Sequence, residues 1–246
     1  MNKRNNISLS IFLSLFVAVF FVAPLVASCG KGTSVSPSTL NIQYRVVNLS
    51  PDLGPVDLYI DYKQFNTYSF YYPSAGGYFF LTSIDTPFQI RPGKDPITGI
   101  IPNTGNIFSM DDTLKPNLSY TLFITGLVSD NSITKLRTID TGALPATGRG
   151  KVRFVNVSPR SNGLDVVANG VSAFKSQKYL KVSKYLEMPA GNYDFQIFPT
   201  GSSTVLRDLQ NVIIQDGRLY TVYAYGLTGT TDSLAFGAGV MASPIK

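Results

Sequence analysis

Few side chains in this chain of 246 residues could carry covalent or catalytic chemistry. The sequence contains one cysteine, Cys29, and no histidine. Without histidine, serine-histidine-aspartate triads, cysteine-histidine pairs and histidine-ligated zinc sites are excluded. What remains is modification of the one thiol, or catalysis by paired carboxylates, by a serine-lysine pair or by a metal held by carboxylates.

Cys29 directly follows a segment typical of a secretory leader. Residues 3–4 are basic, residues 7–22 are apolar apart from three serines, and residues 27–28 are small. This order of features resembles the lipobox that a lipoprotein signal peptidase reads. We therefore expect residues 1–28 to be a lipoprotein signal peptide, and Cys29 to become an acylated N-terminus that holds the protein to a membrane.

The alternative for the same segment is an uncleaved transmembrane helix. Residues 7–27 approach the roughly 20 residues that span a bilayer. Pro24 and the small residues before Cys29 favour cleavage instead. Both alternatives export the rest of the chain. We expect a lipid-anchored location in the cell envelope, at the outer membrane, in either its periplasmic or its surface-facing leaflet.

Residues 29–40 are rich in Gly, Ser, Thr and Pro and predict a flexible tether. Without the two basic residues of 1–28, the net charge of +6 falls to +4, and the chain has no cluster of lysines and arginines. We therefore expect no nucleic-acid partner. An acylated Cys29 leaves no thiol for a disulfide, so stability must come from an apolar core.

The sequence after the tether contains an internal duplication. Three blocks of the first half recur in the second half in the same order, about 100 residues later. The matched blocks are 45–51 with 153–159, 88–92 with 195–199, and 120–127 with 220–227. The pattern predicts two domain copies, over residues 41–140 and 151–246, joined by the Gly- and Pro-rich residues 141–150.

Within each copy, short runs of aromatic and β-branched residues alternate with turn residues. No sustained helical periodicity follows the apolar leader. The fold class is therefore predicted to be all-β, with two tandem antiparallel β-sandwich domains of immunoglobulin-like or transthyretin-like type.

The strings RVVNLSPDLGPVDLYID and RFVNVSPRSNGLDVVANG, followed by KYLEMPAGNYDFQIFPTG, resemble the DUF4397 domain. The resemblance covers nearly all of the chain after residue 40 as two tandem copies, as in lipoproteins of Bacteroidetes. Two departures are an asparagine where the family motif often has histidine, and residues 82–84 in place of the Pro-Ala-Gly turn in copy one. The resemblance implies an exported, surface-associated β domain and supplies no catalytic site.

Asp57 and Asp165 are the carboxylates that recur between the copies. Because each follows a Ser-Pro turn and precedes a β-rich run, we expect a structural hydrogen-bonding role. A catalytic pair would need them within about 5 to 10 Å of each other. The acidic residues 111–112 match no EF-hand loop, so neither a metal nor a cofactor is predicted.

Two further features point to the surface. Thr113 and Ser233 each follow an aspartate and precede a leucine, which resembles the periplasmic O-glycosylation sites of Bacteroidetes. Copy one also has a dense aromatic stretch, in which alternation would send some side chains outward and others into the core. Its members predicted as ligand or partner contacts are Tyr68, Phe70, Tyr71, Tyr72 and Tyr78.

These features predict a lipid-anchored envelope protein that acts as a non-catalytic binding or structural module. Its expected partners are the membrane, through the lipid, and a glycan or another envelope protein, through the aromatic side chains. One alternative is a carbohydrate-binding accessory lipoprotein of a nutrient-uptake system. A second alternative is an envelope hydrolase that uses carboxylates.

Overall fold

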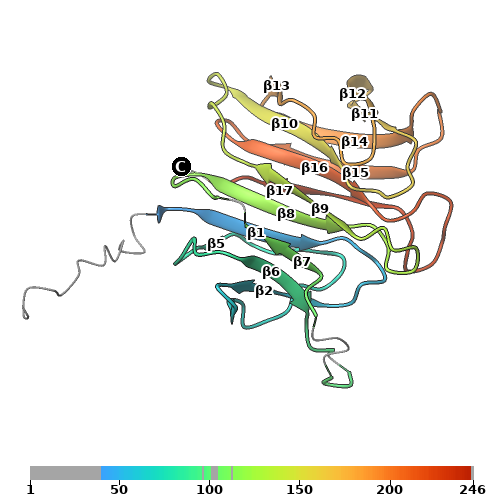
Figure 1. Cartoon of the computed structure of the whole chain (residues 1–246). Helices are drawn as coiled ribbons and strands as arrows, with labels where there is room; N and C mark the ends of the chain where they lie inside the picture. Colours follow the sequence, from blue (N-terminus) through green and yellow to red (C-terminus); the bar gives the residue numbers. More distant parts are fainter. Residues whose placement is uncertain (1–39, 96, 101–104, 112, 245–246) are drawn as a thin grey trace, which may run out of the picture. The chain divides into compact units, whose positions relative to one another are not determined.

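A computed structural model describes residues 40–95, 97–100, 105–111 and 113–244 (Figure 1). Cys29, the predicted signal peptide and residues 29–39 of the predicted tether lie outside this range. All the elements numbered in the described residues are β-strands, which confirms the all-β prediction. Within the same residues, no helix has the length and apolar character needed to cross a bilayer.

Copy one consists of two sheets. Its strands are β1 (Gln43–Asn48), β2 (Val56–Ile60), β3 (Lys63–Gln64), β4 (Ser74–Ala75), β5 (Phe79–Phe80), β6 (Phe88–Pro92), β7 (Phe108–Met110), β8 (Ser119–Thr125) and β9 (Thr134–Ile139). One sheet has the order β4-β1-β8-β9, with β5 also paired to β1, and the other has the order β3-β2-β6-β7.

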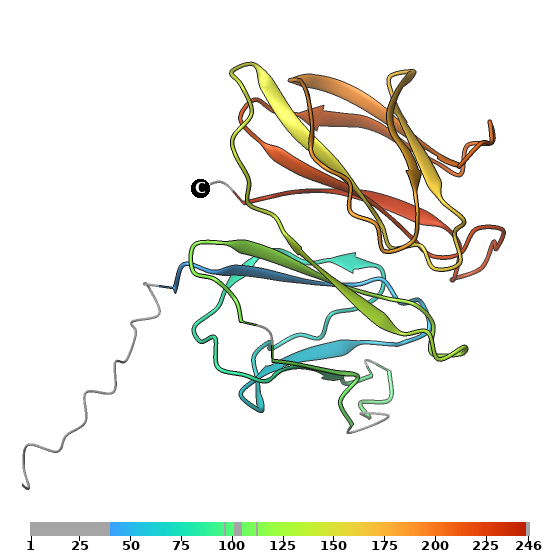
Figure 2. The same ribbon diagram turned by 45° about the horizontal axis from the view of Figure 1, so that its top comes forward.

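Copy two repeats this plan. Its strands are β10 (Arg149–Asn156), β11 (Leu164–Ala168), β12 (Val171–Gln177), β13 (Leu186–Pro189), β14 (Gly191–Pro199), β15 (Arg207–Ile214), β16 (Leu219–Tyr225) and β17 (Gly237–Ala242). Its sheets have the orders β13-β10-β16-β17 and β12-β11-β14-β15. Figure 2 shows the sheets of each copy as layers of a sandwich.

The pairing between numbered strands is antiparallel, as predicted, except at one place in each copy. β1 runs parallel to β8, and β10 runs parallel to β16. The chain leaves β1 to build the other sheet before it returns as β8, and this long crossover is what a parallel pair requires. The same exception in both copies agrees with a duplication of the whole sandwich.

Alternation along β1 explains how the cores are divided. Val46 points into the core of copy one, whereas its neighbour Val47 points to the opposite face of the sheet. Both side chains are fully buried, and every residue of β8 is buried as well. The second face is covered by copy two through a shared apolar cluster. This cluster comprises Val47, Leu49, Phe123, Val155, Val157, Tyr223 and Met241.

The recurring Asn-x-Ser-Pro motif has a structural role in both copies. Asn48 accepts a hydrogen bond from the Ser50 amide at its Oδ1 (3.2 Å), and the Ser50 hydroxyl donates to the Gly126 carbonyl (2.9 Å). The matching serine of copy two, Ser158, donates to the Gly226 carbonyl (2.6 Å). The motif therefore ties the end of β1 to the end of β8, and the end of β10 to the end of β16.

Candidate functional site

The structure separates the five aromatic side chains predicted as contacts. Tyr68 and Tyr71 are exposed, at 84% and 41% of their surface. Phe70 packs against the core of copy one, because its amide and carbonyl pair with the backbone of Val56 and fix its orientation. Only the two exposed tyrosines are therefore placed to contact a ligand from solvent.

Of the other two predicted contacts, Tyr72 meets copy two and Tyr78 reaches a carboxylate of copy one that pairs with copy two. The Tyr72 ring meets the edge of the Tyr225 ring, with centroids 5.9 Å apart. The pKa of Tyr72 is raised to about 12. The main cause is the burial of the Tyr72 hydroxyl, and the nearby Tyr225 hydroxyl and Asp232 carboxylate add smaller effects. The Tyr78 hydroxyl donates to Asp140 Oδ2 (2.7 Å). Both tyrosines thus support the contact between the copies.

Tyr68 and Tyr71 lie at a pocket of about 430 Å³, which we name the aromatic pocket. This volume falls within the range of about 300–1,000 Å³ that is usual for ligand sites. The side chains around the pocket are mostly hydroxyl-bearing or charged. It is lined by Thr67, Tyr68, Ser69, Tyr71, Lys94, Asp95, Ile97, Thr98 and Gly99.

Asn66 holds the first loop of the aromatic pocket in place. Its Nδ2 donates to the Tyr68 carbonyl (3.0 Å) and to Asp57 Oδ1 (2.8 Å). Its Oδ1 accepts from the Leu58 amide (2.7 Å). Asp57, which is 4% exposed, therefore orients the side chain that fixes the backbone at Tyr68. Asp57 thus takes part in a hydrogen-bond network within copy one, and its contribution to stability stays a prediction.

The second loop of the pocket is held against the first. The Gly93 amide donates to the Pro55 carbonyl (2.8 Å), and a Cβ at Gly93 would lie 2.6 Å from Ser69 Oγ. This approach leaves no room for a side chain at residue 93. Further along, Asp95 Oδ1 accepts from the amides of Ile97 (2.8 Å) and Thr98 (2.7 Å).

Both amide hydrogen bonds lower the pKa of Asp95, and the one from Thr98 has a larger effect than the one from Ile97. The carboxylate is therefore ionised at neutral pH. Lys94 precedes it in the same pocket. The aromatic pocket thus combines two exposed rings, several hydroxyl groups and one charge of each sign.

The aromatic pocket lies at the end of β1 that is remote from the N-terminal part of the chain. β1 begins at Gln43, three residues after the first described residue, and ends at Asn48. The Asn48 Nδ2 donates to the Phe70 carbonyl (3.3 Å), within the loop that carries Tyr68 and Tyr71. The chain therefore enters the sandwich at one end of β1 and presents the pocket at the other.

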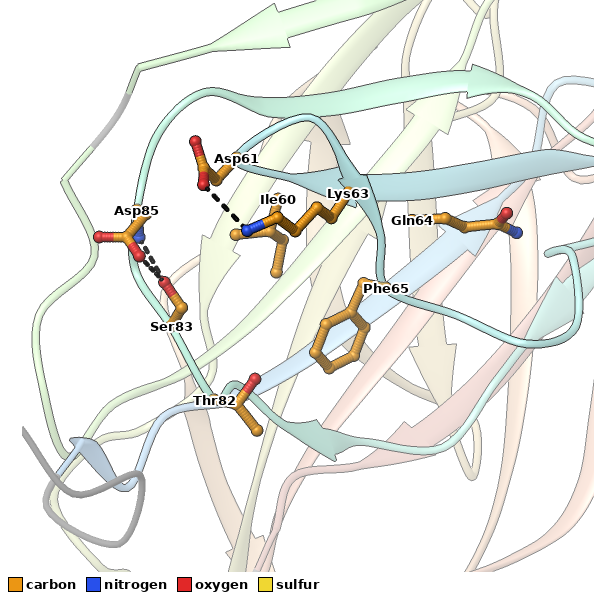
Figure 3. Close-up of a pocket in the computed structure, with 8 residues that line it drawn as sticks. All are labelled: Ile60, Asp61, Lys63, Gln64, Phe65, Thr82, Ser83 and Asp85. Carbon is orange, nitrogen blue, oxygen red and sulfur yellow. Dashed lines mark hydrogen bonds and ion pairs between the residues drawn. The ribbon is translucent and has the colours of Figure 1, made fainter. Parts of the chain in front are cut away.

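A second pocket, of about 340 Å³, lies near the start of β1 (Figure 3). Its polar groups are largely paired with one another. Lys63 Nζ lies 3.6 Å from Asp61 Oδ2, and the Ser83 hydroxyl donates to Asp85 Oδ2 (2.5 Å). Its only aromatic lining residue, Phe65, packs against the core. This pocket offers a ligand fewer open groups than the aromatic pocket does.

A buried charge network lies between the copies. The Asp140 carboxylate, 2% exposed, accepts from Tyr78, from Thr121 (2.6 Å) and from Thr138 (2.7 Å), and it pairs directly with Arg153. Each of these groups therefore has its polar partner inside the protein, and the network is a structural feature rather than an open site.

Arg153 of this network and a second buried arginine beside it, Arg45, occupy matched positions in the duplicated motif. Arg153 Nη1 donates to the Ile139 carbonyl (2.8 Å), and Arg45 Nη2 donates to the Ala242 carbonyl (3.1 Å). Arg45 also stacks over the Tyr78 ring, 3.8 Å from its centroid. Burial lowers the pKa of Arg45, although Tyr78 and Asp140 act in the opposite direction. Its Nε and Nη1 are buried without a hydrogen-bond partner.

The remaining predicted site residues are not brought together. Asp165 lies on β11 of copy two, whereas Asp57 lies on β2 of copy one. Asp165 Oδ1 accepts from the Ser176 amide (2.6 Å) and from the Thr200 hydroxyl (2.9 Å). Thr113 and Ser233 are both exposed. Within the described residues, no group of three acidic or cysteine side chains could hold a metal ion.

Sequence reasoning did not identify the loop that supplies Lys94, Asp95 and Ile97. No local pattern places this loop beside Tyr68, because the two are joined through the long-range contact of Gly93 with Ser69. The one available signal was the Pro-Gly pair at residues 92–93, which marks a turn directly after a strand.

Comparison with known protein families gives one match. The family described as Domain of unknown function (DUF4397) matches residues 43–166 and 150–238. The two matched regions together span both copies of the sandwich. No curated protein matches the chain.

Proposed function

Since the chain belongs to the DUF4397 family, a family of unknown function, we propose its role from its own residues. It is a non-catalytic binding module of the bacterial cell envelope, held to the membrane by lipid on Cys29. Its contact surface is the aromatic pocket of copy one. This proposal joins the leader that precedes Cys29 to the one open pocket with exposed aromatic rings that we describe.

The exposure of Tyr68 and Tyr71 on a fixed loop is the observation that carries the binding role. Exposed aromatic side chains lose hydration readily and keep few rotamers, so they contribute strongly to recognition. Asn66 and Phe70 fix the backbone on either side of Ser69. A preformed surface of this kind binds with a smaller loss of conformational entropy than a mobile loop would.

The strand direction supports the anchored arrangement. A lipid on Cys29 would hold the chain at the end of β1 where Gln43 lies, 14 residues after Cys29 in the sequence. The aromatic pocket lies at the opposite end of β1. The proposed anchor therefore leaves the pocket free to meet a partner away from the bilayer.

A hydrolase built on Asp57 and Asp165 has less support. Both carboxylates already accept hydrogen bonds from groups of their own copy, and they belong to different sheets. Retaining and inverting glycosidases need the two carboxyl groups to face one bond from opposite sides. We therefore favour binding over catalysis.

The anchor is tested by metabolic labelling with a fatty-acid analogue in a bacterial host. Wild-type chain should incorporate the label and sediment with membranes, and Cys29→Ala should lose both the label and normal cleavage. Ser28→Ala, which keeps a small residue before the cysteine, is the matched control and should be labelled. Labelling of Cys29→Ala would overturn the anchor.

The contact surface is tested separately by photo-crosslinking in cells. A photoreactive phenylalanine analogue at residue 68 should crosslink to an envelope component. The same analogue at Tyr62, which is 64% exposed but lies outside the aromatic pocket, is the control and should not. Equal crosslinking at the two positions would overturn the assignment of the surface.

A further inference from the structure

We infer that the aromatic pocket binds an uncharged glycan through its pyranose rings. This inference rests on the binding role proposed for the same pocket, and it adds the chemical class of the ligand. It depends on three properties of the described residues: the exposed rings, the polar groups between them, and the balance of charge.

The first property is the pair of open rings. A pyranose ring has an apolar face of C–H groups that packs on an aromatic ring, and burying that face is favourable. Tyr68 is 84% exposed and Tyr71 is 41% exposed, so both rings are accessible from the pocket. Two rings within one pocket can engage neighbouring sugar units of a chain.

The second property is the density of hydrogen-bonding groups. Three residues with hydroxyl groups, Thr67, Ser69 and Thr98, line the same pocket as the two tyrosines. A purely apolar ligand would cover these groups and leave them without partners, which costs free energy. Sugar hydroxyls both donate and accept, so they can satisfy such groups while the ring faces stack on the tyrosines.

The third property is the balance of charge. Lys94 and Asp95 are neighbours in the pocket and carry opposite charges, and the amides of Ile97 and Thr98 keep Asp95 ionised. The two charges cancel at the scale of a sugar unit. An acidic glycan would gain from Lys94 and lose to Asp95, whereas an uncharged glycan can donate hydroxyl protons to Asp95 and accept one from Lys94.

Copy two does not repeat the residues that form this pocket, which restricts the inference to copy one. At the positions that match Tyr68 and Tyr71, copy two has Lys175 and Lys178. The connection between β14 and β15 is also shorter than the connection between β6 and β7 that carries Lys94 and Asp95. We therefore expect one glycan site in each chain.

The test is an oligosaccharide array probed with the full chain in detergent micelles, followed by titration calorimetry. The array should include neutral hexasaccharides of glucose, mannose and xylose, and hexagalacturonate as the acidic comparison. We expect binding to a neutral saccharide and none to hexagalacturonate. Tyr68→Ala and Tyr71→Ala should each weaken that binding by about tenfold, close to what one stacked ring contributes.

Two controls separate stacking from folding. Tyr68→Phe keeps the ring and should retain most of the affinity. Tyr62→Ala removes another exposed tyrosine, which lies outside the pocket, and should leave the affinity unchanged. Because residues 62, 68 and 71 are all exposed, each variant should keep the thermal unfolding midpoint of the wild type, which circular dichroism checks.

The outcomes distinguish this inference from the proposed function. The assignment of an uncharged glycan as the ligand would be overturned by any of three results. These are no binding to a neutral saccharide, binding only to hexagalacturonate, and binding that Tyr68→Ala leaves unchanged. If the analogue at residue 68 then still crosslinks, and the crosslinked partner is a protein, the binding role stands and the ligand class is wrong. Loss of both results would overturn the binding role as well.

Discussion

Replacing Asp140 with asparagine should strongly destabilise the protein, although the substitution preserves the shape of the side chain. In the wild type, one carboxylate lies between two buried arginines, Arg45 and Arg153, which are 7% and 4% exposed. Asparagine removes the only negative charge that we find in this network. It also replaces one carboxylate oxygen with a donor, either at Oδ2, which accepts from Tyr78 and Thr121, or at Oδ1, which accepts from Thr138 and Arg153.

The expected magnitude follows from the burial of the pair. Removing one partner of a buried ion pair costs about 3–5 kcal/mol, because the remaining charge stays buried without compensation. Here the remaining charge is Arg153, which pairs directly with Asp140 and also donates to Thr138 (3.1 Å). We expect Asp140→Asn to lower the free energy of unfolding by about 3–5 kcal/mol, a large part of the usual 5–15 kcal/mol of a domain.

Urea denaturation measures this loss, with far-ultraviolet circular dichroism and tyrosine fluorescence as the signals. Tyrosine fluorescence is used because the chain has no tryptophan. The matched control is Asp130→Asn, which removes the same charge from a pair with Arg160 whose arginine is 60% exposed. That variant should unfold like the wild type, because exposed pairs contribute little. If Asp140→Asn lost no more stability than Asp130→Asn, the reasoning about the buried network would be wrong.

Three further predictions concern the carboxylates and the linker. Asp57→Ala should lower the free energy of unfolding by about 1–3 kcal/mol, measured by urea denaturation, because Asn66 loses its acceptor; unchanged stability would contradict the structural role. Protease cleavage within residues 142–148 should leave the two halves together on gel filtration, because they share a buried apolar cluster; separation without denaturant would contradict it. At Asp165, burial raises the pKa, but hydrogen bonds from Ser176 and Thr200 outweigh it and lower the pKa. Its contribution to stability should therefore be present above about pH 4 and be lost as the pH falls further, so the unfolding midpoint of Asp165→Asn should depend less on pH between 5 and 2 than that of the wild type.

Much of the fold could be predicted from the sequence, because the repeated blocks coincide with its strands. Block 45–51 covers most of β1, block 88–92 is β6, and block 120–127 contains most of β8, with matching strands in copy two. Strand pairing in a sandwich depends on alternating apolar residues and on turns, and both are visible locally. The parallel pairing of β1 with β8 was not visible, because it depends on where the chain returns after a long crossover.

The contact between the copies was hidden by its polar residues. Arg45, Asp140 and Arg153 read as surface residues, since charged side chains are rarely buried without a partner. A signal was available at residues 120–125, where six residues read as a nearly continuous β run without charge. Such a run is typical of a strand buried on both faces, and it predicts a covering layer over the sheet of β8.

The candidate site was only partly predictable, because it lies where regular alternation ends. Phe70, Tyr71 and Tyr72 are consecutive, and period-two reasoning would place Phe70 and Tyr72 on one face. Instead, Phe70 packs into the core of copy one while Tyr72 meets Tyr225 of copy two. In a loop, each side chain is directed by its own hydrogen bonds and packing contacts rather than by strand geometry, so composition identified the region but not its exposed members.

Comparison of the two copies shows where the scaffold was kept and where it was changed. Asn48 donates to the Phe70 carbonyl, and its counterpart Asn156 donates to the Gln177 carbonyl (2.8 Å). The same asparagine hydrogen bond therefore holds the segment at Phe70 in copy one and the segment at Gln177 in copy two. In copy two the chain before Gln177 forms the strand β12, which pairs with β11. In copy one the corresponding chain is irregular and carries Tyr68.

This difference assigns different tasks to the copies. Copy two covers the second face of the β1–β8 sheet and supplies Arg153 to the buried network. It thereby holds rigid the strand whose far end positions the aromatic pocket. Since the pocket depends on a loop that copy two replaces with β12, and on a longer connection after β6, the proposed binding surface belongs to copy one alone and copy two supports it.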